Sequence, residues 1–133
     1  MGRSLNDYLN AGENLLLELP SVLLNFRFGA IACQTDIQSA FHQAAVSEED
    51  RKYLQFFWSD MCLRFARVPF GLTCYPFMLL KVVKVHLNRY DESDRSLCRL
   101  IRKGIYMDDI CIGFEGRQDA ENAMRRTQEI FSE

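Results

Sequence analysis

The segment that most constrains this chain is an apolar run, residues 104–114, interrupted by the adjacent carboxylates Asp108 and Asp109. The arms on either side are β-prone, so the run predicts a hairpin with both acids at its tip. Neighbouring like charges repel and half-buried carboxylates lose hydration, and a bound divalent cation would offset both costs. A four-residue string of an aromatic residue, any residue and two Asp arises by chance in roughly a few per cent of chains of this length. A metal site therefore needs a further carboxylate.

Asp36 is the candidate for that third carboxylate. It closes an apolar segment, residues 30–37, which is predicted to be a buried strand and is followed by a turn of small residues. A strand-end Asp by itself is more often a capping or surface residue. Two metal ions about 4 Å apart can clamp the attacking and leaving oxygens of a phosphoryl transfer, and carboxylates on rigid backbone hold such ions. A strand end and a hairpin tip in one sheet would supply them.

The composition indicates one globular domain. The 133 residues are 48% hydrophobic and 26% charged, which suffices for a real core. No apolar stretch reaches the ~18 residues of a membrane span, and no signal-peptide core follows the first residues. We expect an intracellular, cytoplasmic protein without membrane contact.

The five cysteines form no Cys-x-x-Cys pair, so we expect reduced thiols rather than zinc ligands or disulfides.

The net charge of −2 does not indicate a nucleic-acid-binding protein, but the charge is unevenly distributed. Residues 61–105 carry nine basic and three acidic groups, whereas the segments before and after are both acidic. One interpretation is a set of solvated helix faces. The other is a basic flank beside an acidic site, as expected where metal ions handle a polyanion.

Hydrophobic periodicity predicts an α+β domain, a mostly antiparallel sheet covered by helices. The first helix is expected over Pro20–Arg27, because Pro20 fits the first turn. The wider segment, residues 14–28, has helical periodicity, and its apolar face is expected from Leu15, Leu16, Leu19, Leu23, Leu24 and Phe26. The later expected elements are a hairpin of 53–58 with 61–68, a helix over 77–88, a short helical segment over 97–103, the 104–114 hairpin and a helix over 119–131.

Three segments resemble the catalytic motifs of reverse transcriptases, in order and in spacing: residues 35–41, 67–73 and 106–109. Further strings are similar to the Bel/Pao group of LTR retrotransposons. These strings are residues 4–7, 23–27, 47–51 and 56–58. The resemblance implies that residues 1–133 form a partial reverse transcriptase domain. Its fold would be a polymerase palm with the base of the fingers, truncated at both ends.

The resemblance also implies a metal centre. Asp36 and Asp108 would hold two Mg²⁺ ions, with Mn²⁺ as an alternative, and the Ile37 carbonyl would assist. Asp109 would be the more peripheral carboxylate of the Tyr-x-Asp-Asp motif. The reaction would be a two-metal nucleotidyl transfer, in which a primer 3′-hydroxyl attacks the α-phosphate of a dNTP.

Other residues would bind the nucleotide and the primer. The amides of Ser39 and Ala40 would meet the triphosphate, and Phe41 would be the steric gate against a ribose 2′-hydroxyl. Phe41 by itself would more simply be a core residue. The remaining implied contacts are Phe70, Gly71 and Met107 for the nucleotide, with Tyr106 and Arg67 for the primer and template. Met107 could equally pack in the core and Arg67 could lie on a solvated face.

The implied function is that of an RNA-directed DNA polymerase domain from a retrotransposon polyprotein, working on a primed RNA or DNA template. Fingers, thumb and RNase H domains would be its partners in that polyprotein, and the 133-residue chain alone is expected to be inactive. The alternative is a catalytically inactive or repurposed retroelement remnant that acts at most as a binding module. A two-metal nuclease is less favoured, because Phe41 and residues 69–71 have no purpose in it.

Overall fold

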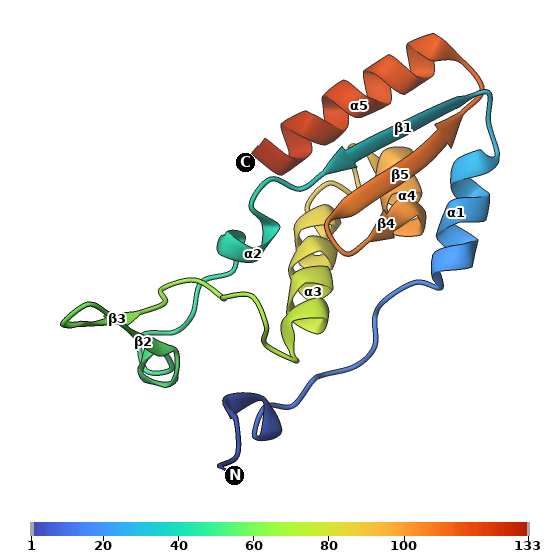
Figure 1. The fold of residues 1–133 in the computed structure, drawn as a ribbon. Helices are drawn as coiled ribbons and strands as arrows, with labels where there is room; N and C mark the ends of the chain where they lie inside the picture. Colours follow the sequence, from blue (N-terminus) through green and yellow to red (C-terminus); the bar gives the residue numbers. More distant parts are fainter. Residues whose placement is uncertain (1, 133) are drawn as a thin grey trace.

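The centre of the fold is a three-stranded antiparallel sheet. A computed structural model describes residues 2–132, and for Phe41 it describes the backbone but not the side chain. The strand order is β1-β5-β4, so β5 lies in the middle (Figure 1). The predicted strand over 30–37 and the predicted 104–114 hairpin are both confirmed. The strands are β1 (Ile31–Asp36), β4 (Ile105–Tyr106) and β5 (Asp109–Phe114).

One face of this sheet forms the core. Ile110, Ile112 and Phe114 alternate along β5 and are buried, and the β1 residues opposite them are half-buried. Because successive side chains in a strand point to opposite faces, the residues between them lie on the other face. That other face carries the exposed side chains of Gln34 and Asp36 on β1. The apolar alternation therefore directs the carboxylates away from the core.

Helices cover the apolar face of the sheet (Figure 1). Leu87, Ile101 and Ile130 come from three different helices and are fully buried in the same cluster as the β5 side chains. Burial of each such side chain contributes about 1.5–3 kcal/mol. The helices are α1 (Leu19–Arg27), α2 (Ala40–Gln43), α3 (Tyr75–Asn88), α4 (Arg95–Gly104) and α5 (Arg117–Ser132), with short 3₁₀ helices at Leu5–Asp7 and Arg51–Tyr53.

The expected apolar face of the first helix was wrong. Leu23 and Leu24 lie exposed, Leu24 by 62%, whereas Val22 is the buried residue of α1. The helix contacts β5 and α4 along a narrow side, and hydrophobic periodicity alone does not say which side that is. Leu15 and Leu16 do pack against the core, but from the extended segment before α1. Pro20 lies in the first turn as predicted.

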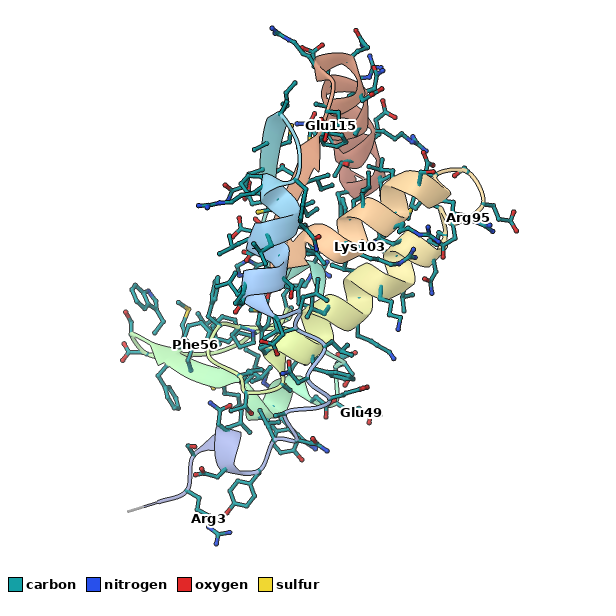
Figure 2. All side chains as sticks on the ribbon, turned by 90° about the vertical axis from the view of Figure 1, so that its right-hand side faces the viewer. Arg3, Glu49, Phe56, Arg95, Lys103 and Glu115 are labelled. Atoms are coloured by element: carbon teal, nitrogen blue, oxygen red, sulfur yellow. The ribbon has the colours of Figure 1, made fainter. Side chains whose placement is uncertain are left out.

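A second, two-stranded sheet stands apart from the first. Its strands, β2 (Gln55–Trp58) and β3 (Met61–Arg64), form the predicted aromatic-rich hairpin with a shorter return strand. The hairpin projects away from the layer of helices, with Phe56 on β2 (Figures 1 and 2). No helix within residues 2–132 has the length and apolar character needed to cross a membrane.

An ionic network joins the start of α4 to α5. Arg126 donates from Nε and Nη2 to the two carboxylate oxygens of Asp94, at 3.0 and 2.9 Å. Ser93 Oγ donates to the same carboxylate at 2.6 Å. The bonds from Arg126 and Ser93 lower the pKa of Asp94 to about 2. The Asp94 side chain is only 15% exposed, so the network is more than a surface ion pair.

We expect Asp94→Asn to lower the free energy of unfolding by about 1–2 kcal/mol at pH 7, because hydrogen bonds to charged groups are worth more than neutral ones. The pKa of Asp94 is lower in the folded than in the unfolded chain. Its contribution is therefore present above about pH 4 and is lost as pH falls toward about 2. Urea denaturation across that range measures it.

The control for Asp94→Asn is Glu121→Gln, which breaks the exposed pair between Arg117 and Glu121 within α5. That variant should change the free energy of unfolding by less than about 0.5 kcal/mol. Equal effects of the two substitutions would contradict a special role for the Asp94 network.

Candidate active site

The β4–β5 hairpin turns in two residues. Tyr106 pairs with Asp109, which leaves Met107 and Asp108 as the turn. Met107 has a φ of 57°, a left-handed conformation that a bulky side chain rarely adopts. Such backbone persists only where the surroundings hold it, and it gathers at functional sites. The prediction of two acids at the hairpin tip is confirmed, with Asp108 in the turn and Asp109 opening β5.

The strand β1 brings Asp36 to the same end of the sheet. Asp36 is the register partner of Asp109, and the Ile37 amide donates to the Asp108 carbonyl at 2.9 Å. Directly opposed residues project from the same face with Cβ atoms about 5 Å apart. Tyr106 pairs with Asp109 from the other side, so Tyr106, Asp109 and Asp36 form one row across three strands. The backbone thus gathers the three predicted carboxylates at one edge.

The donor types of this edge fit a hard cation such as Mg²⁺, which prefers carboxylate and carbonyl oxygens. The side chains are not drawn together around one point. Within residues 2–132, no three His, Cys, Asp or Glu side chains are grouped closely enough to hold a metal ion. Asp36 is exposed while Asp108 and Asp109 are half-buried. Convergence of the carboxylates on an ion would therefore require side-chain rotation on a fixed backbone.

Two residues that were not predicted from the sequence interact with the carboxylates, one by a hydrogen bond and one electrostatically. Gln34 Nε2 donates to Asp109 Oδ1 at 3.2 Å from the same face of β1 as Asp36. Tyr75, at the start of α3, is buried, and its pKa is raised by burial and then by the charge of Asp108. The phenol therefore stays protonated. The only feature of the sequence that pointed to Gln34 was its two-residue spacing from Asp36. No feature of the sequence pointed to Tyr75.

The turn after β1 is closed by its own backbone. Ser39 has a φ of 53°, and the Ala40 amide donates to the Ile37 carbonyl at 3.1 Å. Two backbone groups with implied ligand roles are thus bonded to each other. Ala40 itself is buried, and Ser39 is exposed. The prediction that Phe41 is a steric gate concerns a side chain that lies outside the described residues.

The segment of the second motif lies against the end of α2 and the residue after it. The Val68 amide donates to the Ala44 carbonyl at 3.1 Å, and Arg67 Nη1 donates to the Gln43 carbonyl at 3.4 Å. Phe70 is 66% exposed. Its ring lies edge-on to that of His42, with centroids 6.1 Å apart. The structure therefore places the second motif beside residues 42–44, which directly follow the first motif.

Gly71 and Met107 are the other predicted nucleotide contacts. Gly71 has a φ of 93° and open space where a Cβ would stand, while Met107 packs partly against the core.

A cavity of about 660 Å³ lies between α2, α3 and the end of α5, lined among others by Ser39, Ala40 and Tyr75. The described lining of this cavity includes neither Gly71 nor Met107, nor the three carboxylates. The cavity borders the candidate site without enclosing it.

A two-residue hairpin with adjacent acids, a neighbouring strand ending in an acid and a helical layer behind them define a palm of the polymerase type. The foamy viral protease-reverse transcriptase, solved in complex with an RNA/DNA hybrid, has a similar fold with a TM-score of 0.67 at 17% sequence identity. The match covers 85% of this chain and 14% of that one.

The sequence pattern described as "Reverse transcriptase (RNA-dependent DNA polymerase)" matches residues 25–133. The chain therefore belongs to the reverse transcriptase family. A comparison with curated proteins finds no match. The resemblance drawn from three short motifs is confirmed at the level of the family and of the α+β palm fold.

Proposed function

We propose that residues 1–133 are the palm and fingers base of an RNA-directed DNA polymerase from a retrotransposon polyprotein of the Bel/Pao type. One observation carries this proposal: Asp36 faces Asp109 in register while the Ile37 amide is bonded to the Asp108 carbonyl. Family membership and the palm-like fold support it. The strings at residues 4–7 and 23–27 support the Bel/Pao assignment.

Asp36 and Asp108 would hold two divalent cations, Mg²⁺ or Mn²⁺, with the Ile37 carbonyl assisting and Asp109 more peripheral. When bound, such ions lower the pKa of the attacking hydroxyl and neutralise charge on the leaving group. The protein's own part is to hold Asp36 and Asp109 on paired strands and Asp108 in the adjoining turn, so that only side-chain rotation remains. Gln34 orients Asp109 by its hydrogen bond, and the charge of Asp108 acts on the buried Tyr75, whose pKa it raises.

The nucleotide would lie between the first and second motifs. Ser39, Ala40 and Phe41 would meet the triphosphate and sugar from one side, and Phe70 and Gly71 would approach from the other. Because the Ala40 amide is bonded to the Ile37 carbonyl, the turn would have to open for either group to act as a ligand. The remaining assigned contacts are Met107 to the sugar, Tyr106 to the primer end and Arg67 to the primer or template.

The template is proposed to be RNA or DNA carrying a primer. This rests on the family and on the similar fold of a protein solved with an RNA/DNA hybrid. Since the chain corresponds to 14% of that protein, we propose that fingers, thumb and RNase H domains act with it and that the chain alone is inactive. Intracellular, cytoplasmic action is part of the proposal.

The alternative function is that of an inactive remnant, which acts at most as a binding module. The separation of the acidic side chains within residues 2–132 favours it, because no three of them gather at one point. Primer extension with dNTPs on RNA and DNA templates, by this chain joined to adjoining polyprotein segments, distinguishes the two. Extension in Mg²⁺ or Mn²⁺ supports the polymerase, and its absence in both ions supports the remnant.

Phe41→Val is expected to admit ribonucleotides in that assay. Removal of the ring would open the space that a 2′-hydroxyl needs, so the dNTP preference over rNTP should fall by about tenfold or more. The measurement is kcat/KM for dCTP and CTP on one template. The control is Phe65→Val, because Phe65 packs on Phe56 in the β2–β3 hairpin, and it should leave sugar preference unchanged. Unchanged preference in Phe41→Val would remove the gate role.

A further inference from the structure

Asn6 connects the beginning of the chain to the second motif, 65 residues further on. Its Nδ2 donates to the Gly71 carbonyl at 2.7 Å, and its Oδ1 accepts from the Thr73 amide at 3.1 Å. One side-chain amide therefore holds the backbone on both sides of Leu72. It offers a donor and an acceptor to the loop, as a neighbouring strand would.

The turn that carries Asn6 is built by its immediate neighbours. The backbone amide and the hydroxyl of Ser4 both donate to Asp7 Oδ2, at 2.6 and 3.1 Å. The Asp7 amide donates in return to the Ser4 carbonyl at 3.2 Å. This reciprocal cap fixes the 3₁₀ turn from which Asn6 projects. Leu5 and Leu72 line one mainly apolar groove of about 650 Å³, which brings the turn and the loop together.

Within the loop at residues 70–73, Leu72 packs against the core and its carbonyl accepts from the Tyr75 amide at 3.1 Å, whereas Gly71 next to it is exposed. Gly71 has a φ of 93°, and nothing lies within 4 Å of where its Cβ would be. Glycine in an exposed loop has a large conformational entropy to lose on ordering. Side-chain hydrogen bonds to the backbone on both sides of the loop reduce the number of conformations that it can sample.

We propose that Asn6 is a positioning residue that clamps the Phe70–Thr73 loop in the conformation that receives the nucleotide. The nucleotide part of this inference rests on the proposed function of Phe70 and Gly71. A preformed loop does not have to be ordered when the nucleotide binds, so the clamp strengthens binding. Its loss should raise KM for the dNTP more than it lowers kcat, because Asn6 does not touch the carboxylates.

Hydrogen exchange in the 133-residue chain tests the clamp without any catalysis. The Thr73 amide should exchange at least about tenfold faster in Asn6→Ala than in the unchanged chain, because its acceptor is gone. In Asn6→Asp the acceptor for Thr73 remains while the donor to Gly71 is lost. Thr73 should then stay protected in that variant.

The matched control is Asn10→Ala, because Asn10 Oδ1 accepts a local bond, from the Gly12 amide two residues on at 2.9 Å. It should leave Thr73 exchange unchanged. Protection of the Ile112 amide in β5 reports whether each variant is folded. If the core of Asn6→Ala is intact and its Thr73 amide exchanges as slowly as in the unchanged chain, the clamp does not exist.

Primer extension by the chain with its adjoining segments tests the nucleotide part. Asn6→Ala should raise KM for dNTP by about tenfold and change kcat less than threefold, as expected for two lost hydrogen bonds of ordinary strength. Faster Thr73 exchange with an unchanged KM would overturn the link to the nucleotide. Absence of extension in the unchanged protein would overturn the proposed function and this link together, whereas the exchange result would still decide on the clamp.

Discussion

Replacement of Asp108 by Asn, in the chain joined to its neighbouring polyprotein segments, is expected to reduce primer extension by about 10²–10³-fold or more. Asn has nearly the same shape but no charge, so it would neither bind a divalent cation as Asp does nor balance its charge. Loss of one preorganised electrostatic group at a reacting centre typically has an effect of this size. Because the Asp108 backbone carbonyl bonds to the Ile37 amide, the hairpin itself should remain in place.

The control for Asp108→Asn is Asp119→Asn. Asp119 is an exposed acid in the first turn of α5, beyond the opposite end of β5, so the charge change is the same but the site is distant. It should retain extension within about twofold. The measurement is the single-nucleotide addition rate at saturating Mg²⁺ and dNTP. Full activity in Asp108→Asn would show that the assignment of the metal-binding carboxylates is wrong.

The largest loss of stability is expected from Gly104→Ala. Gly104 ends α4 where the helix meets β5, and a Cβ there would overlap the carbonyl oxygen of Cys111. Backbone in a central strand cannot move aside cheaply, so the helix or the strand must shift. We expect the free energy of unfolding to fall by about 2–3 kcal/mol, although Ala favours a helix more than Gly does. Urea denaturation monitored by circular dichroism measures the change.

Gly116→Ala is the matched control for Gly104→Ala. A Cβ at position 116 would come no closer than 3.4 Å to Asp119 Oδ2, which is the end of a movable side chain. Its effect on the free energy of unfolding should stay within about 0.5 kcal/mol. If the two variants were equally stable, the close approach of α4 and β5 would be wrong.

Much of the fold could be predicted because its signals are local. The apolar runs along 30–37 and 104–114 predict a strand and a hairpin, and in the folded sheet a shift of one residue would bury the carboxylates. The register that places Asp36 opposite Asp109 is therefore the one that keeps the apolar side chains inside. The helix over 119–131 was also predicted from its periodicity, and Ala120, Thr127 and Ile130, which repeat at helical spacing, are all buried.

The packing of α1 could not be predicted in the same way. Nearly every turn of the segment before and within this helix carries a Leu, so several faces are equally apolar. The side that meets β5 depends on the angle at which the chain enters the sheet, and this selects Val22 rather than Leu23 or Leu24. The start of α3 at Tyr75 rather than Phe77 likewise depends on the loop before it, where the Tyr75 amide bonds to the Leu72 carbonyl.

The hairpin with Asp108 and Asp109, the strand ending in Asp36 and the family resemblance could all be inferred from the amino-acid sequence, because each depends on residues close together in the chain. The bond from Gln34 to Asp109 and the hold of Asn6 on the loop at Gly71 became visible in the folded chain. These contacts join residues 75 and 65 positions apart. Such contacts depend on strand register and loop packing, which the periodicity of a short segment does not encode.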